Sequence, residues 1–149
     1  MGKNESRTRP EPDREPRSQY AALPWRRTQA GALEVLLITS RETRRWVIPK
    51  GWGKKGESAT IAAAREALEE TGAGGRLGEA PLGHYRYIKQ LKNGRQQAVR
   101  VAVYALEVVH EHEDWPERQV REKLWTSAAE AATLVDEPEL QALIAKFDP

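Results

Sequence analysis

The apolar positions of the chain begin to recur regularly at about residue 20. Residues 31–39 and 45–49 are apolar and rich in β-branched, aliphatic and aromatic side chains, which predicts two strands. Pro49 and Gly51 end the second strand, because both residues interrupt regular structure. The first half of the chain therefore begins with sheet.

Two further segments show the strand pattern in the second half of the chain. Residues 83–90 and 97–109 are rich in valine, tyrosine and alternating apolar positions. Asn93-Gly94 lies between them, and this dipeptide is typical of a tight hairpin turn. The two segments are predicted to pair as neighbouring antiparallel strands.

Three segments have the composition of helices. Residues 58–71 are rich in Ala, Glu and Leu, and Gly72 is a natural C-terminal stop. Residues 127–135 open at a serine cap, and residues 137–147 carry Pro138 in the first turn. Strands and helices mixed in this order, with neighbouring hairpins, predict an α+β fold built as a layered α/β/α sandwich.

The helix at residues 58–71 is amphipathic in an unusual way. Glu66, Glu69 and Glu70 share one face, because positions three and four apart lie together on a helix. The opposite face carries Ile61, Ala64 and Leu68. We expect this apolar face to pack against the sheet.

Composition limits the class of protein. The chain has 149 residues, 24 Lys+Arg against 22 Asp+Glu, and no cysteine. The near-balance of charge gives no general case for nucleic acid, and disulfides, thiol catalysis and thiolate metal sites are excluded. No apolar run is long enough to span a bilayer, and no signal segment opens the chain. We expect a cytoplasmic protein with no membrane partner.

The first residues differ from the rest of the chain. Residues 1–18 have almost no apolar content and mix both charges with prolines. Such a segment buries too little surface to offset its ordering entropy, which predicts a mobile charged tail. An anion-binding arm is the alternative. Residues 19–149 are then expected to form a single domain.

Three carboxylates on one helix face have two interpretations. In the simpler one they are solvated, and the Glu66–Glu70 pair costs only about 0.2–0.5 kcal/mol. In the other they form an oxygen platform for Mg²⁺, which also bridges to phosphates. The loop from Lys50 to Gly56 precedes the helix start, where backbone N–H groups favour phosphate oxygens. The adjacent loop favours the metal interpretation.

The same residues resemble a known family motif, the Nudix box. The matching positions are Gly51, Glu57, Arg65, Glu66, Glu69, Glu70 and Gly72, followed by the apolar Ala73. Compatible strands extend the resemblance over about residues 20–147. The resemblance implies a mixed sheet between helices, bound Mg²⁺ or Mn²⁺, and hydrolysis of a diphosphate linked to another moiety.

The resemblance also implies roles for individual residues. Glu66 and Glu70 would be the main metal ligands, and Glu69 a further ligand or the base that activates water. The carbonyl of Lys50 would complete the metal shell. Arg65 would orient the catalytic carboxylates, and Gly51, Glu57 and Gly72 would shape the box. Metal charge would offset the phosphates and acidify a water for attack on phosphorus.

The position of the catalytic base is left open by the resemblance. Members of the family differ in whether the base lies in the box or on a later loop. Glu111 and Glu113 are the later-loop candidates. The simpler interpretation is that both are ordinary loop acids.

A second stretch of sequence points to a substrate class. Residues 44–52 resemble the branch that contains diphosphoinositol polyphosphate and diadenosine polyphosphate hydrolases. Polar and basic residues suited to a polyphosphate rim are Arg26, Arg27, Ser40, Arg41, Lys89, Lys92, Arg95, Arg118 and Arg121. The alternative for each cluster is a solvated surface cation.

Several aromatic and histidine residues have both a binding and a packing interpretation. Trp52 replaces the second glycine usual after the box glycine, and either packs or stacks on a base. Tyr85 and Tyr87 alternate on a strand, and packing is favoured over adenine stacking. His110 and His112 share a strand face, but no convincing third ligand accompanies them.

Three functions follow, in order of preference. The first is an Mg²⁺-dependent pyrophosphohydrolase acting on an anionic, polyphosphorylated small molecule. The second is removal of pyrophosphate from RNA 5′ ends, for which the basic hairpin would act as a guide. The third is a catalytically silent module that binds a nucleotide. The complete acidic set argues against the silent module, since a pure binder does not need it.

Overall fold

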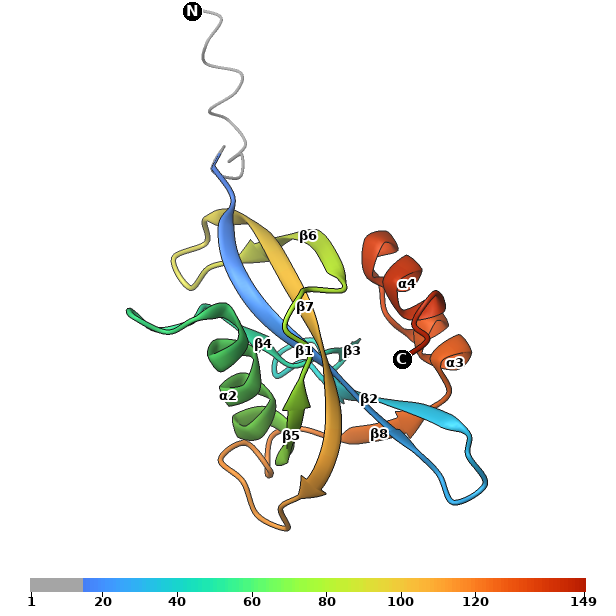
Figure 1. Ribbon diagram of the computed structural model, residues 1–149. Coiled ribbons are helices and arrows are strands. Elements are labelled where there is room, and N and C mark those ends of the chain that lie inside the picture. Colours follow the sequence, from blue (N-terminus) through green and yellow to red (C-terminus); the bar gives the residue numbers. More distant parts are fainter. Residues whose placement is uncertain (1–14) are drawn as a thin grey trace, which may run out of the picture.

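The computed structural model describes residues 15–149, which fold into one mixed sheet with helices on both faces (Figure 1). The elements are β1 (Arg17–Arg27), β2 (Leu33–Thr39), β3 (Trp46–Val47), β4 (Lys50–Gly51), α2 (Ala59–Thr71), β5 (Ala73–Leu77), β6 (Gly83–Gln90), β7 (Gln96–Glu111), β8 (Lys123–Thr126), α3 (Ala128–Leu134) and α4 (Pro138–Ala145). The predicted α+β class and its layered architecture are confirmed.

The sheet is organised around β1 and β7. The main path runs β3-β2-β1-β7-β5, while β4 pairs with β1, β6 with β7 and β8 with β2. Strands β1 and β7 are parallel, and the other pairs are antiparallel. The first and last thirds of the chain therefore meet at the centre of the sheet, next to the short strand that opens the box loop.

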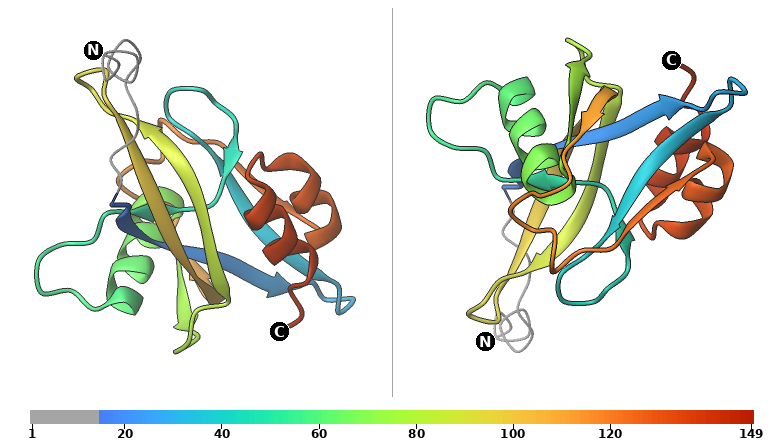
Figure 2. Two further views of the ribbon diagram at one scale, coloured as in Figure 1. Left: turned by 90° about the horizontal axis from the view of Figure 1, so that it is seen from above. Right: turned by 90° about the horizontal axis from the view of Figure 1, so that it is seen from below.

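Alternate residues of β1 face different layers. Ala21 and Leu23 are fully buried on the side covered by α3 and α4, and Ala22 packs with Ala67 and Leu106 on the side of α2. The two further views show α2 on one side of the sheet and the α3–α4 pair on the other (Figure 2). The larger core lies beneath α3 and α4.

Helix α2 begins and ends where its sequence predicts. Ser58 is the N-cap, and its side chain accepts a hydrogen bond from the Ile61 N–H. Gly72 adopts a left-handed conformation with φ of 77°, and its N–H donates to the Leu68 carbonyl. The box helix is thus fixed at both ends.

The face that α2 buries is not the one that was expected. Ile61 and Leu68 are 59% and 39% exposed. The buried residues are Ala62, Ala63, Ala67, Glu70 and Thr71. Small alanines let the helix approach the sheet closely, and the inward face is the one that carries Glu66 and Glu70. The prediction that Ile61, Ala64 and Leu68 form the sheet-facing side was therefore wrong.

The predicted hairpin between the later strands is confirmed. Gln90 pairs with Gln96, and Gly94 in the turn has φ of 84°. The strands β4, β5 and β8 were not expected, because each is too short or too rich in glycine and charge to show a pattern. Strand β1 begins at Arg17, inside the predicted tail, whose residues 1–14 lie outside the described part of the chain.

Candidate active site

The carboxylates of Glu66 and Glu70 meet at the strand that precedes the box loop. The Lys50 N–H donates to Oε1 of Glu70 at 3.3 Å. A Cβ atom on Gly51 would overlap the Glu66 carboxylate, so only glycine leaves room for that group. The box glycine and the two glutamates therefore form one compact unit between β4 and α2.

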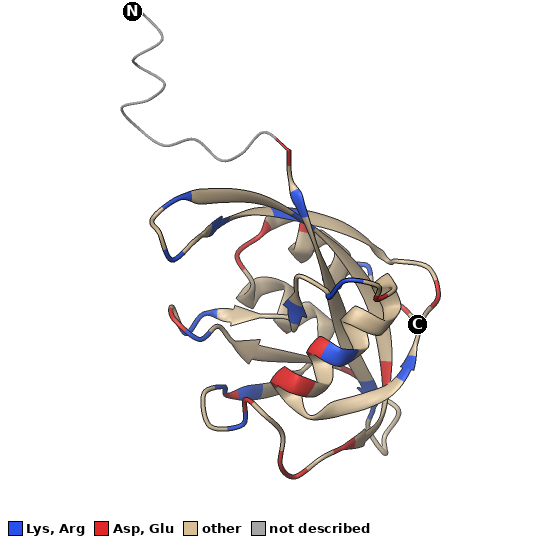
Figure 3. Cartoon of the chain, turned by 90° about the vertical axis from the view of Figure 1, so that its left-hand side faces the viewer, with Lys and Arg blue, Asp and Glu red and all other residues tan. Residues whose placement is uncertain are grey.

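Arg65 holds the acidic residues of the box in place. Its Nε donates to Oε2 of Glu57 at 2.7 Å and its Nη2 to Oε1 at 3.0 Å, a bidentate pair. Its Nη1 lies 3.2 Å from Oε2 of Glu66 and 3.3 Å from Oε1 of Glu69. Hydrogen bonds from Arg65 lower the pKa of Glu57 to about 2. Figure 3 shows acidic and basic residues adjoining one another along helix α2.

The three glutamates are not equivalent. Glu66 and Glu70 are largely buried, whereas the Glu69 side chain is 36% exposed and held aside by Arg65. Among residues 15–149 no group of three or more acidic or histidine side chains is close enough to hold a metal ion unaided. The structure thus brings two of the three carboxylates together with the backbone of Lys50.

The charge state of the buried pair is unusual. Burial raises the pKa of Glu70 to about 8, and burial also raises the pKa of Glu66, whose carboxyl hydrogen-bonds Glu70. Two buried carboxyls beside one another are unfavourable when both are ionised. A hard divalent cation removes this penalty by neutralising both groups, and it prefers carboxylate and carbonyl oxygens. The donor set at Gly51 therefore fits Mg²⁺ or Mn²⁺.

Arg121 lies behind Glu70 and not on an open rim. Its Nη2 is 2.7 Å from Oε1 of Glu117 and 3.5 Å from Oε2 of Glu70, and its Nη1 donates to the Thr39 carbonyl at 3.0 Å. The side chain is only 9% exposed. Arg121 thus supports a box carboxylate. Glu117, its neighbour, was not among the residues predicted from the sequence. The four-residue spacing of Glu117 and Arg121 could have indicated this ion pair.

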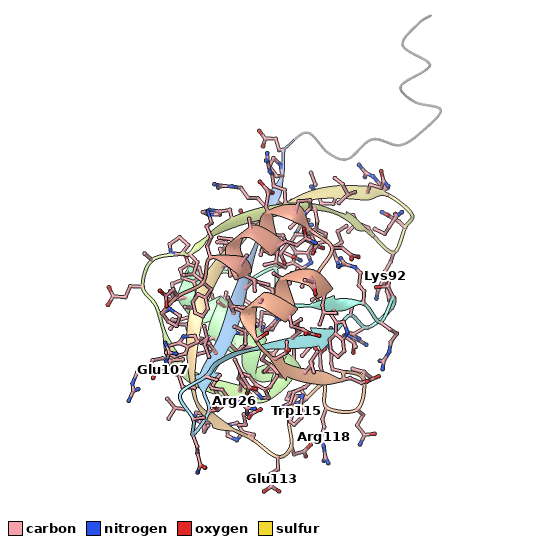
Figure 4. The ribbon with its side chains drawn as sticks, turned by 90° about the vertical axis from the view of Figure 1, so that its right-hand side faces the viewer. Arg26, Lys92, Glu107, Glu113, Trp115 and Arg118 are labelled. Atoms are coloured by element: carbon pink, nitrogen blue, oxygen red, sulfur yellow. The ribbon has the colours of Figure 1, made fainter. Side chains whose placement is uncertain are left out.

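The two later-loop acids lie apart from the carboxylate pair. Oε2 of Glu111 accepts hydrogen bonds from Lys123 Nζ at 2.9 Å and from Trp125 Nε1 at 3.2 Å. This carboxylate oxygen is therefore engaged by two side chains of β8. Glu113 is exposed, and its side chain points away from the protein (Figure 4). Trp115 anchors the loop, because its Nε1 donates to the Glu70 carbonyl at 3.1 Å.

Most of the expected substrate-binding residues are spread over the surface. Arg26 is bonded to Glu34 at 2.9 Å and stacks on Trp125. Arg27 donates to the Gly31 carbonyl, Ser40 bonds within its own loop, Arg41 is exposed, and Arg118 lies 3.8 Å from Asp114. In Figure 4 Arg26 and Arg118 lie far from Lys92, at the end of the hairpin. These residues do not form one cluster.

The sequence analysis did not predict the cluster of polar side chains on the α4 side of the sheet. The Lys50 ammonium lies 5.4 Å from the Tyr87 ring, and burial lowers its pKa to about 8 in spite of the nearby Glu70 and Glu137. Arg45 donates to Glu137 at 2.8 Å, and Lys89 also lies near enough to act on the Lys50 charge. The side chain of Lys50 therefore supplies a cation beside the carboxylate pair.

The aromatic residues mainly pack. Tyr85 is buried in the core, and the Tyr87 hydroxyl donates to Gln19 at 2.7 Å. Trp52 packs against the same core, with the Arg17 guanidinium 4.0 Å from its ring. The packing interpretation of Tyr85 and Trp52 is confirmed. The rings of His110 and His112 are 4.8 Å apart and exposed, with no third metal ligand among the described residues.

Comparison with known proteins gives one consistent family. The NUDIX domain model matches residues 16–147. Nudix hydrolase 12, a mitochondrial protein of Arabidopsis thaliana, is 36% identical over 118 residues, which is 77% of this chain and 58% of that protein. Diphosphoinositol polyphosphate phosphohydrolase 3-beta of Bos taurus is 39% identical over 83 residues, covering 55% of this chain and 46% of that protein.

A solved structure extends the likeness to three dimensions. A C. elegans Ap4A hydrolase in a binary complex superposes with a TM-score of 0.62 and 25% identity, covering 87% of this chain and 93% of that one. The chain belongs to the NUDIX domain family, which confirms the resemblance. It spans little more than half the length of the first curated relatives.

The comparisons do not support the predicted cytoplasmic location as they support the family. No helix among residues 15–149 is long and apolar enough to cross a membrane. Two of the plant relatives are named as mitochondrial proteins. These names do not favour the cytoplasm, so the cytoplasmic location stays a prediction.

Proposed function

We propose that the chain is a divalent-metal-dependent hydrolase that cleaves the diphosphate bond of a polyphosphorylated small molecule. The observation that carries the proposal is the pair of buried carboxyls, Glu66 and Glu70, packed against Gly51 and held by Arg65. Ionising both buried carboxyls at once is unfavourable, and a bound divalent cation would remove this cost. The names of the bovine and nematode relatives support a diphosphoinositol polyphosphate or a diadenosine polyphosphate as the substrate type.

The metal would be held by Glu66, Glu70 and the backbone carbonyl of Lys50. When bound, Mg²⁺ supplies positive charge for the phosphate oxygens and acidifies a water. The reaction adds one water across the P–O–P bridge and gives two phosphate-terminated products and a proton. Catalysis then depends mainly on positioning and electrostatics.

The proton of the attacking water is assigned to Glu69. This carboxylate is partly exposed, and Arg65 holds it near Glu66 without burying it. Arg65 is proposed as a positioning residue, because its guanidinium is occupied by Glu57, Glu66 and Glu69.

The remaining phosphates would meet the cations on the α4 side of the site. Lys50 is the nearest, and Lys89 lies on the same strand face as Tyr87. Arg41 and Arg118 are exposed and are proposed as outer contacts. Arg118 has only a long ion pair of 3.8 Å with the exposed Asp114, whereas Arg26 and Arg121 lie in shorter ion pairs. An ammonium in a partly dry site strengthens binding of an anion.

The experiment is to separate the cleavage products by anion-exchange chromatography after incubation of each substrate with the full chain, with Mg²⁺ or with EDTA. The panel contains a diphosphoinositol polyphosphate, diadenosine polyphosphates, ADP-ribose and triphosphate-ended RNA. We expect metal-dependent cleavage of one of the first two classes, lost in Glu70→Gln and kept in the control Glu79→Gln, which changes an exposed loop acid. Equal activity of Glu70→Gln and the wild type would refute the metal assignment, and preference for RNA would refute the substrate class.

A further inference from the structure

A cavity on the sheet lies outside the carboxylate site. Its volume is about 330 Å³, and it is lined by Pro16, His84, Arg86, Arg100 and Glu139. These residues come from the segment before β1, from β6, from β7 and from α4. Cavities that bind small ligands begin at about this size.

Two arginines face each other in this cavity. Arg86 and Arg100 are directly opposite across the antiparallel β6–β7 ladder. Like charges at such positions destabilise a sheet unless another group compensates. Glu139 compensates Arg86, because its carboxylate accepts from the Arg86 backbone N–H at 2.8 Å and from Nη2 at 3.0 Å.

Arg100 has no such compensation. It is exposed, and within residues 15–149 its guanidinium forms no hydrogen bond or ion pair with any side chain or carbonyl. The Arg86 Nη1 group is also left without a bond to Glu139. His84 is close enough to Arg100 for its charge, after burial, to lower the imidazole pKa. The cavity thus gathers free N–H donors and one uncompensated positive charge.

The location of the cavity relative to the box follows from the sheet register. His84 is opposite Ala102, Ala102 is beside Tyr20, and Tyr20 is opposite Gly51. Directly opposite residues point to the same face of a sheet. A Cβ atom on Gly51 would point toward Glu66, on the face covered by α2. The side chain of His84 therefore lies on that face too. Three strand spacings separate His84 and Gly51 by about 14 Å.

We propose that this cavity is a second anion-binding site, which takes the phosphate group of a ligand through Arg100, with Arg86 and His84 as further donors. Guanidinium groups bind phosphate with two parallel hydrogen bonds, which an exposed and unpaired arginine can provide. The source of the phosphate is either a distal group of a substrate held at the carboxylate site or free phosphate. The proposal does not depend on the reaction at the carboxylates.

The test is a titration of the full, metal-free chain in EDTA with inorganic phosphate, followed by ¹H–¹⁵N NMR. We expect the amide signals of His84, Arg86 and Arg100 to shift together. Arg100→Gln should weaken the affinity by about tenfold or more, since one charged donor pair is lost. The control Arg76→Gln changes an exposed arginine on β5 that pairs with Glu107, and it should leave the affinity unchanged.

Two further measurements distinguish a loss of phosphate binding at Arg100 from a loss of stability or from binding at the carboxylate site. Thermal unfolding without phosphate should show Arg100→Gln to be as stable as the wild type, since the substitution removes a like-charge contact. Glu70→Gln should bind phosphate as the wild type does. Equal weakening in Arg100→Gln and Arg76→Gln, or shifts confined to the box loop, would overturn the proposal.

Steady-state kinetics distinguish the two possible sources of the phosphate group. If the phosphate belongs to the substrate, Arg100→Gln raises KM and leaves kcat unchanged, most for substrates with a phosphate far from the cleaved bond. If free phosphate is the ligand, KM is unaffected, and the change of rate on adding phosphate disappears in Arg100→Gln.

Discussion

At the scale of single residues, the site depends on the absence of a side chain at Gly51, the box glycine. Gly51 has no side chain, and the Glu66 carboxylate fills the space where a Cβ would lie. Its φ is not in the left-handed region, so the requirement for glycine comes from this contact and not from backbone strain. The close approach lets a helix carboxylate reach the strand that contributes Lys50.

Gly51→Ala should therefore displace Glu66 while the fold is kept. We expect Mg²⁺ affinity and kcat/KM to fall by about 10–100-fold, as for loss of groups that orient a ligand. The measurement is calorimetric titration with Mg²⁺, together with steady-state kinetics on the preferred substrate. Gly78→Ala is the control, because a Cβ there meets only ordinary van der Waals contacts. Unaltered metal affinity in Gly51→Ala would contradict this account of the box glycine.

The buried acid also predicts how stability depends on pH. The pKa of Glu70 in the folded chain, about 8, lies above its ordinary value of 4.5. The folded state therefore holds a proton that the unfolded state loses, and the free energy of unfolding falls as pH rises from 4.5 to 8.

Without metal, the wild type should lose stability across this range relative to Glu70→Gln, by up to a few kcal/mol. The measurement is urea unfolding in EDTA at several pH values between 5 and 8. Excess Mg²⁺ should restore the stability of the wild type and leave the variant unchanged. Parallel pH profiles of the two proteins would count against an unfavourable charge at Glu70.

Several residue contacts of the site follow from sequence spacing alone. The Arg65–Glu69 pair and the left-handed cap at Gly72 depend on neighbours within one helix, and both are present. The positions of Arg121 and of the Lys50 ammonium depend on which distant strands pair. Pattern within one segment carries no information about such pairing, so the contact of Arg121 with Glu70 and the position of the Lys50 ammonium could not be predicted.

At the scale of elements, α2 shows why its apolar stripe was misinterpreted. The stripe at Ile61, Ala64 and Leu68 has the spacing of a core face, but the face that turns inward carries Glu66 and Glu70. The inward face is then lined by Ala62, Ala63 and Ala67, which pack on Ala22 and Leu106. Functional geometry overrides the hydrophobic pattern here.

A pair of leucine substitutions tests this orientation. Leu106→Ala removes a buried side chain beneath α2 and should cost about 2–5 kcal/mol of the free energy of unfolding. Leu68→Ala changes a partly exposed residue and should alter it by about 0.5 kcal/mol or less. Both values come from urea unfolding at one pH. A cost of several kcal/mol for Leu68→Ala would restore the original prediction for the helix face.

At the scale of the whole molecule, the fold brings segments far apart in sequence to one site. Strand β4 lies between β1 and α2, and the loop of residues 112–122 closes on the end of α2 through bonds to Glu69 and Gly72. The layered class that the family motif predicted is confirmed, and the site residues that it names stay a prediction. The motif did not predict the strand order, because the short strands β4, β5 and β8 have no periodic signal of their own.

The distribution of cations leads to a prediction about substrate size. Lys50 lies beside the carboxylates, while Lys92 is exposed at the end of the hairpin (Figure 4). For a small substrate, Lys50→Gln should raise KM about tenfold, and Lys92→Gln should change it less than about twofold. Steady-state kinetics on the preferred substrate checks both. If Lys92→Gln impaired turnover of RNA alone, RNA would replace the small molecule as the substrate.

The proposed mechanism requires that Glu66 and Glu70 hold the divalent cation and that Glu69 accept the proton of the attacking water. Calorimetric titration of Mn²⁺ into the wild type, Glu70→Gln and Glu69→Gln tests it, with turnover of the preferred substrate measured on the same samples. We predict that Glu70→Gln loses both binding and turnover, whereas Glu69→Gln keeps binding and loses turnover. Wild-type affinity in Glu70→Gln, or loss of binding in Glu69→Gln alone, would contradict the account.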